Sequence, residues 1–160
     1  MKIDVFILNY QDTQHAQDML FLLENYALDP MGGANALIQT VKENLAIELS
    51  KLPHAFSVIC YVDGQPAGLA NCFEAFSTFK CQPLINIHDL VVLSEFRGLG
   101  VSQKILQHIE HIAEQKGCCK VTLEVLEGNH IAKNAYLKFG FSGYELDPQM
   151  GKALFWEKPL

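Results

Sequence analysis

The sequence predicts a mixed α and β fold in which a mostly antiparallel, twisted sheet is flanked by about four helices. In some segments apolar residues recur every three to four positions, as in helices, and in others they alternate, as in strands. The 160 residues have the length of one domain, and 49% are hydrophobic against 19% charged. We therefore expect one single domain over residues 1–160 that buries a substantial core.

The N-terminal third is predicted to form one strand and two helices. Apolar residues alternate from Ile3 to Ile7, which predicts the strand. Asp12 stands where an N-cap begins a helix, and the apolar stripe of that helix continues to Ala27. The second helix is expected from about Asn35 and ends before Pro53.

The middle of the chain changes to the period of strands. Segments 56–62 and 67–79 flank an Asp63-Gly64 turn, which predicts an antiparallel hairpin. Segment 84–93 is a third long strand, and its apolar character places it centrally in the sheet.

A helix is predicted from about Val101 to Lys116, and Gly117 ends it. Segment 121–126 is the next strand. Because a helical crossover joins segment 84–93 to segment 121–126, these two strands should be parallel.

The last predicted elements are a short helix over 131–139, closed by Gly140, and two strands at 141–144 and 153–157. With these the sheet contains about six or seven strands.

Composition excludes several classes of function. Twelve Lys and Arg against 18 Asp and Glu give a net charge of -6, so nucleic acid is not an expected partner. No uncharged run reaches the roughly 18 residues of a membrane helix, and the segment from Met1 to Asp12 lacks the unbroken apolar centre and the cleavage site of a signal peptide. The 5 cysteines lack metal-binding or disulfide spacing, and His108 and His111 lack a third ligand. We expect a cytoplasmic protein with no metal and no membrane partner.

The most informative motif is Arg97-Gly98-Leu99-Gly100-Val101-Ser102, between a strand and a helix. Glycines let the backbone approach a ligand, and the N–H groups of a first helical turn attract an anion such as pyrophosphate. Arg97 would add a charge-assisted contact. Val101 after Gly100 excludes a Walker loop, and the lack of a third glycine at Gln103 excludes a dinucleotide fingerprint. A plain glycine-containing turn is the alternative.

A linked series of motifs runs from residue 84 to 141. The motifs are Ile87-His88-Asp89-Leu90-Val91-Val92-Leu93, Arg97 to Ser102, Leu123-Glu124-Val125, Asn129, Ala132, Tyr136 and Gly140-Phe141. Their order resembles the GNAT superfamily of N-acetyltransferases, and segment 89–98 is most similar to diamine and polyamine acetyltransferases. The chain departs from the family at Ser102, where glycine or alanine is usual, and at His88-Asp89, where the polyamine enzymes have Glu-Asp.

The resemblance implies the acyl-CoA N-acyltransferase fold with a splayed parallel strand pair, acetyl-CoA as cosubstrate, and a homodimer. It implies that Tyr136 is the general acid that protonates the departing thiolate; the alternative is a packed aromatic on a short helix. By the same analogy, backbone groups near a distortion of strand 84–93 would stabilise the oxyanion and pair with the pantetheine arm. The implied cofactor-binding residues are Val91, Val92, Leu93, Arg97, Gly98, Leu99, Gly100, Val101, Ser102, Asn129 and Tyr136.

Amine acetylation also requires a base or a relay to water, since an ammonium with a pKa of about 10.4 is neutral in only about one molecule in 2,500 at pH 7. His88, Asp89, Glu124 and Glu127 are all candidates, and His88 and Asp89 head the catalytic assignment. As neighbours on a strand, these two should face opposite sides unless a bulge intervenes.

The sequence thus predicts an enzyme that transfers the acetyl group of acetyl-CoA to a primary amine of a small molecule, a polyamine or an amino-acid-like compound. The amine would attack directly in a ternary complex. The alternatives are a protein or peptide N-acetyltransferase, which needs an open groove, and a non-catalytic acyl-CoA-binding module, which Tyr136 disfavours. The acceptor, the base, the effect of Ser102 and the oligomeric state stay open at this point.

Overall fold

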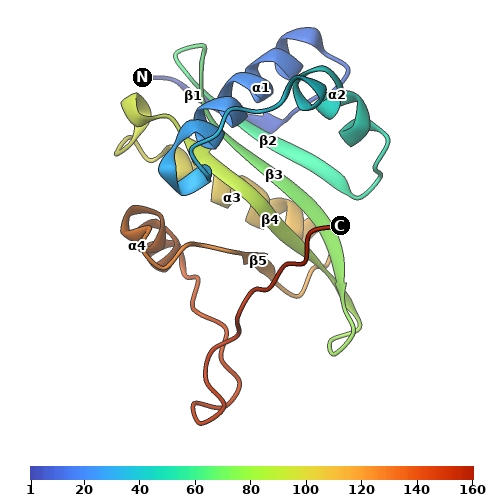
Figure 1. Ribbon diagram of the computed structural model, residues 1–160, viewed down its shortest axis with the longest axis vertical. Coiled ribbons are helices and arrows are strands. Elements are labelled where there is room, and N and C mark those ends of the chain that lie inside the picture. Colours follow the sequence, from blue (N-terminus) through green and yellow to red (C-terminus); the bar gives the residue numbers. More distant parts are fainter.

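One five-stranded sheet runs through the computed structural model, which describes residues 1–160. The strand order is β1-β2-β3-β4-β5, and four α-helices surround the sheet (Figure 1). The strands are β1 (Ile3–Ile7), β2 (Ala55–Val62), β3 (Gln65–Ser77), β4 (Gln82–Val92) and β5 (Val121–Leu123). The helices are α1 (Thr13–Leu28), α2 (Gln39–Ser50), α3 (Val101–Gln115) and α4 (His130–Phe139), with short 3₁₀ turns η1 (Pro30–Gly32) and η2 (Ser94–Phe96).

Strands β1 to β4 form an antiparallel meander, and β5 joins it in parallel to β4. Helix α3 makes the crossover between these last two strands, which confirms the predicted parallel pair. Asp63 and Gly64 both have positive φ, as a two-residue hairpin turn between β2 and β3 requires. The mixed fold is confirmed.

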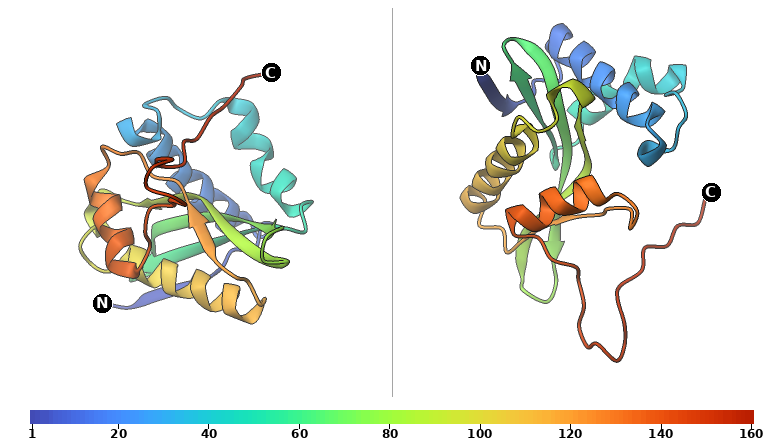
Figure 2. Two further views of the ribbon diagram at one scale, coloured as in Figure 1. Left: turned by 90° about the horizontal axis from the view of Figure 1, so that it is seen from below. Right: turned by 90° about the vertical axis from the view of Figure 1, so that its left-hand side faces the viewer.

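The helices divide the core into two layers, one on each face of the sheet (Figure 2). On one face, α3 packs its buried stripe of Val101, Ile105, Ile109 and Ile112 against the strands. On the other face, α1 and α2 cover the sheet through Met19, Leu22 and Leu49. Asp12 caps α1 as predicted, because its carboxylate accepts a hydrogen bond from the His15 backbone N–H at 2.9 Å. No helix combines the length and apolar character needed to cross a membrane.

Helix α2 begins at Gln39 and not at the predicted Asn35. The segment before it is tied to the end of α1, because the Asn35 backbone N–H donates to the Ala27 carbonyl at 3.0 Å. Gly33 and Ala34 adopt positive φ in this connection. A chain held in this way cannot take up helical dihedrals until it has left the contact.

The two predicted strands at 141–144 and 153–157 are wrong, and the predicted strand at 121–126 is shorter than expected, ending at Leu123. After α4 the chain leaves the body as a C-terminal arm, defined here as residues 142–160, whose one β contact is an isolated bridge between Glu145 and Lys152 (Figures 1 and 2). An alternating apolar pattern is compatible with a strand, but a strand also needs a partner for its backbone groups. The sheet therefore has five strands and not six or seven.

Candidate active site

A β-bulge lies in β4 where β4 and β5 separate. Pairing of the two parallel strands ends at Ile87 and Leu123, whereas β4 continues to Val92. On its other side, β4 pairs Ile87 with Cys72 and Asp89 with Asn71, so His88 is the extra residue. The β5-facing edge of β4 from His88 onward is left without a strand partner, which offers backbone groups to a ligand.

The bulge brings His88 and Asp89 to the same face of the sheet. The His88 ring lies edge-on to Phe73, with 5.8 Å between the ring centroids. The Asp89 carboxylate accepts a hydrogen bond from Asn71 Nδ2 at 2.9 Å. Because Asn71 and Phe73 are alternate residues of β3, they share one face. Both catalytic candidates therefore point to the side covered by α1, His88 exposed and Asp89 half-buried.

Alternation along β4 also decides which backbone groups reach the open edge. The Leu93 N–H donates to the Ala67 carbonyl at 3.0 Å, so it is taken by β3 and is not offered to a cofactor. The backbone N–H and C=O groups of Val91 point toward β3, like those of Leu93, whereas the backbone groups of Val92 point toward the opposite edge. The Val92 carbonyl indeed accepts from Arg97 Nε at 3.2 Å. Of the three predicted residues, Val92 presents its backbone to the gap, and Leu90, which sequence reasoning missed, shares its direction.

The loop before α3 has the backbone geometry of an anion site. Gly98 and Gly100 have φ of 80° and 84°, a region that residues with a side chain rarely adopt. Gly100 is the N-cap of α3, and no side chain caps the first turn of that helix, which begins with Val101 and Ser102. The Val101 side chain is buried in the core, so only its backbone faces the loop. Uncapped N–H groups and the positive end of the helix dipole favour an anion here.

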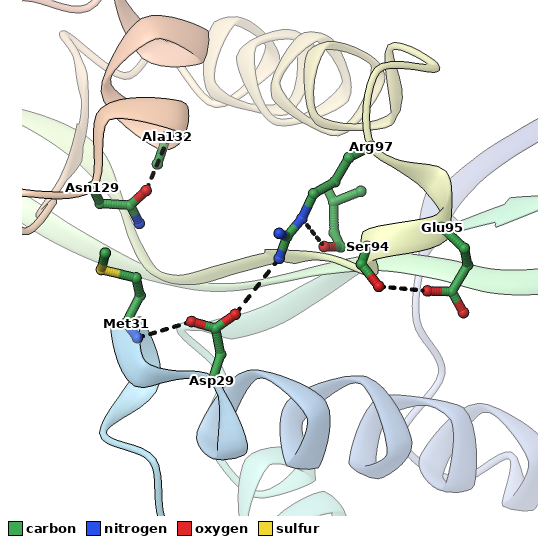
Figure 3. A network of polar contacts seen from close by, with 8 residues as sticks. Asp29, Met31, Ser94, Glu95, Arg97, Asn129 and Ala132 are labelled. Carbon is green, nitrogen blue, oxygen red and sulfur yellow. Dashed lines mark hydrogen bonds and ion pairs between the residues drawn. The ribbon is translucent and has the colours of Figure 1, made fainter.

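Arg97 extends from this loop to the end of α1 (Figure 3). Its Nη2 lies 3.7 Å from Asp29 Oδ2, and the two side chains are 47% and 36% exposed. An ion pair this long and this exposed contributes about 0–1 kcal/mol. The Asp29 ion pair therefore holds the Arg97 guanidinium only weakly, and the other contact of this side chain is the Nε hydrogen bond to the Val92 carbonyl.

Asn129 caps the N-terminus of α4, and Tyr136 lies within that helix. Asn129 is the N-cap, because its Oδ1 accepts from the Ala132 backbone N–H at 3.2 Å (Figure 3). The Tyr136 ring is 9% exposed and packs edge-on to Phe141 at 5.9 Å between centroids. Its hydroxyl has no hydrogen bond in the protein, and no buried side-chain oxygen lacks a partner, so this hydroxyl is open to solvent or ligand. The ring belongs to the core and the hydroxyl is free to react.

Tyr26 of α1 lies close enough to both Tyr136 and Asp89 to interact with each of them electrostatically. Burial raises the pKa of Tyr136 to about 12, and the nearby Tyr26 of α1 adds to the rise. Burial likewise raises the pKa of Tyr26, and Asp89 and Asp29 raise it further. Tyr26 thus lies within electrostatic reach of Tyr136 and of Asp89, and α1, β4 and α4 converge on one region. Tyr26 carries no motif, so sequence reasoning missed it.

The other predicted bases do not join this region. Glu124 and Glu127 are exposed in the segment between β5 and α4, and their carboxylates make no hydrogen bond to β4. No group of three or more His, Cys, Asp and Glu side chains is arranged to hold a metal ion. Ser57 and Asn71, by contrast, are buried polar residues that interrupt the apolar runs of β2 and β3. That interruption is the sequence signal that would have found them.

Comparison with known proteins identifies the family. Residues 20–141 match the model of the acetyltransferase (GNAT) family. A thialysine N-epsilon-acetyltransferase of Bos taurus is 35% identical over 68 residues, which are 42% of this chain and 39% of that protein. Its counterpart in Caenorhabditis elegans is 26% identical over 121 residues, which are 76% of this chain and 71% of that protein.

Solved structures share the fold over most or all of the chain. AAC(6')-Iy in complex with a bisubstrate analogue superposes with a TM-score of 0.78 at 18% identity, covering 100% of both chains. The ribosomal-protein-alanine N-acetyltransferase of Brucella melitensis biovar Abortus 2308 gives a TM-score of 0.69 at 17% identity, covering 91% of this chain and 99% of that one. The resemblance seen in the sequence motifs is confirmed by the family match over 122 positions between residues 20 and 141, and the chain belongs to the GNAT family of acetyltransferases.

Proposed function

We propose that the protein, acting as a single domain, transfers the acetyl group of acetyl-CoA to a primary amine of a small molecule. The bulge in β4 carries the proposal, because it puts His88 and Asp89 on one face beside the gap between β4 and β5. A carboxylate and an imidazole at this point suit an incoming ammonium. The thialysine enzymes and AAC(6')-Iy, by their names, acetylate small amines, which supports the same class of acceptor.

The residues around the gap fit acetyl-CoA, which supplies an acetyl thioester and leaves as a thiolate. The uncapped first turn of α3 suits the pyrophosphate, and so does Arg97, whose ion pair with Asp29 is long and exposed. The β5-facing backbone of Leu90 and Val92 suits the amide groups of the pantetheine arm. The backbone N–H groups of Leu90 and Val92 would donate to the oxyanion that develops on the acetyl carbonyl.

Three side-chain roles complete the proposed mechanism. Asp89 holds the acceptor ammonium by charge, and His88, beside it on the same face, accepts the proton that the amine must lose before it attacks. Tyr136 donates a proton to the thiolate as the carbon–sulfur bond breaks, and the second proton, which the nitrogen loses as the amide forms, restores the Tyr136 hydroxyl. The acetamide and the CoA thiol leave, and the first proton passes from His88 to solvent. A polyamine or an amino-acid-like amine suits the acidic Asp89 and Asp29; a peptide N-terminus is the alternative acceptor, and a panel of both kinds of amine decides between them.

Substitution of Gly100 by Asp should weaken CoA binding by about tenfold or more, which corresponds to 1.4 kcal/mol. The new carboxylate would repel the pyrophosphate, and a side chain at a φ of 84° strains the loop. Isothermal titration calorimetry with CoA measures the effect, and Arg97→Ala should lower the affinity less. Gly64→Asp is the matched control, because Gly64 has a φ of 80°, nothing within 4 Å of an added Cβ, and lies in the β2–β3 turn. Unchanged affinity in folded Gly100→Asp protein would remove the loop from the site.

We also propose that the protein is a homodimer in the cytoplasm. All five cysteines are free thiols, which supports a reducing compartment. The outer edge of β5 has no strand partner, and a groove of about 280 Å³ beside it is lined by apolar residues including Val121, Phe139 and Phe141. The large apolar side chains exposed on the C-terminal arm are Tyr144, Leu146, Met150, Leu154, Phe155, Trp156 and Leu160. A second copy is the partner that buries both surfaces.

Sedimentation velocity at micromolar concentration should show a dimer. Trp156→Asp together with Phe155→Asp should shift the population toward monomer, because charges replace the exposed apolar side chains of the arm. Phe79→Asp, at a still more exposed site in the β3–β4 turn, is the control and should leave the dimer intact. A wild-type monomer would refute the dimer.

A further inference from the structure

A row of hydrogen-bonded side chains crosses the sheet beneath α1 and ends at Asp89. It starts at Tyr10, just after β1, and continues through Ser57 of β2 and Asn71 of β3. Ser57 is paired with Asn71 and Asn71 with Asp89 in the strand register, so one residue of each strand stands opposite the next. The row connects the candidate active centre at β4 with the β1 edge of the sheet.

All hydrogen bonds of the row point toward Asp89. The Ser57 hydroxyl donates to Asn71 Oδ1 at 2.6 Å, so its oxygen is left to accept from the Tyr10 hydroxyl at 2.8 Å. The Asn71 amide then donates to Asp89 Oδ2 at 2.9 Å. The Asn71 amide neither gains nor loses a proton near neutral pH, so the row orients groups and does not conduct protons. Donors aligned in one direction strengthen one another.

The middle of the row is sealed from water. Ser57 is 0% exposed and Asn71 is 5% exposed, and no buried polar side-chain atom lacks a partner. Two apolar residues at these positions would hold the sheet together about as well, because a buried neutral hydrogen bond adds little net stability. The polar pair therefore calls for a role other than stability.

The bulge makes the connection possible. In a regular strand, the pairing of Ile87 with Cys72 would place the next residue, His88, opposite Asn71. With the bulge, the carboxylate of Asp89 occupies that position and its Oδ2 is fixed by the Asn71 amide. Asp89 Oδ1 has no hydrogen-bond partner in the protein, and it is the oxygen left for a ligand.

We propose that Asn71 is a positioning residue, which with Ser57 and Tyr10 fixes the Asp89 carboxylate so that its second oxygen faces the acceptor amine. The inference rests on the proposed function, in which Asp89 receives the ammonium. Preorganised groups of this kind matter because a displacement of about 1 Å at a reacting centre costs about 10²-fold in rate.

The test compares Asn71→Ala and Asn71→Asp with wild type. Asn71→Ala should lower kcat/KM for the amine by about 10- to 100-fold, while CoA affinity measured by calorimetry stays the same. In Asn71→Asp two facing carboxylates would share a proton, so the acid limb of the pH profile of kcat/KM should move to higher pH. Carbon NMR of the side-chain carboxyls, with the Asp89 signal assigned from Asp89→Asn, should show a changed Asp89 resonance in both variants.

Tyr61→Phe is the matched control. The Tyr61 hydroxyl donates to Asp18 Oδ2 at 2.6 Å on the same face, but neither residue belongs to the row. This variant should lose a comparable amount of stability and leave the pH profile and the Asp89 resonance unchanged.

Two outcomes separate the two proposals. If wild type acetylates no amine but the Asn71 variants still change the Asp89 resonance, the proposed function fails and the fixing of the carboxylate stands. If wild type is active and folded Asn71→Ala and Asn71→Asp match it in kcat/KM, pH profile and resonance, the positioning role is overturned.

Discussion

Tyr136→Phe is expected to lower kcat by about 10²- to 10⁴-fold and to leave the affinity for CoA nearly unchanged. Phenylalanine keeps the ring, which packs in the core against Phe141, and removes only the hydroxyl. Since the hydroxyl has no partner in the protein, its loss leaves no buried group unsatisfied, and the fold should be preserved. A large effect on kcat would therefore report chemistry and not packing.

The raised pKa of Tyr136 bears on this role. At a pKa of about 12 the hydroxyl keeps its proton throughout the physiological pH range, so it is always able to act as an acid. An ordinary thiolate, with a pKa of about 8.5, would be too weak a base to take that proton fully. The burial that disfavours a tyrosinate also disfavours a thiolate beside it, which raises the pKa of the thiol from its ordinary value toward that of Tyr136. Wild-type activity should accordingly show no alkaline limb from Tyr136 up to about pH 10.

Single-turnover acetyl transfer, followed by rapid quench, is the measurement that separates chemistry from product release. Tyr144→Phe is the control, because Tyr144 is 60% exposed on the C-terminal arm. Transfer by Tyr136→Phe at the wild-type rate between about pH 6 and 9 would mean that water or another group protonates the thiolate.

Asp89→Asn is expected to lower kcat/KM for the amine by about 10²- to 10³-fold, again without loss of CoA affinity. The change keeps the size of the side chain and removes the charge that holds the ammonium. It also places an amide opposite the Asn71 amide, where Asp89 Oδ2 accepts a hydrogen bond at 2.9 Å. The loss should be largest for acceptors with two cationic groups, because Asp29 and Asp89 both lie near Tyr26 at the end of α1.

His88→Gln tests whether His88 accepts the proton while Asp89 holds the ammonium. If His88 accepts the proton, this variant should mainly lower kcat, whereas Asp89→Asn should mainly raise KM. Steady-state kinetics with saturating acetyl-CoA, across small amines and peptides, measure both effects. Full activity of Asp89→Asn with every acceptor would remove Asp89 from the site.

The sequence by itself determined the features that depend on neighbouring residues. Helix α3 has the predicted stripe because its apolar residues recur with the helical period, and Gly100 opens it because only glycine adopts its φ of 84° freely. The parallel pair of β4 and β5 followed from chain order, since a helical crossover leaves few alternatives. Tyr136 lies on the predicted helix for the same local reason.

The tertiary structure decided which of these residues face one another. A period of two shows that 84–93 is a strand, but not that His88 is bulged out of it, because the bulge depends on pairing with Cys72 and Asn71 from another strand. That one inserted residue turns Asp89 toward Asn71 and Val92 toward the gap. The segments 141–144 and 153–157 failed as strands for the converse reason: a strand exists only where another backbone satisfies its hydrogen bonds, and that partner is set by contacts between residues far apart in the chain.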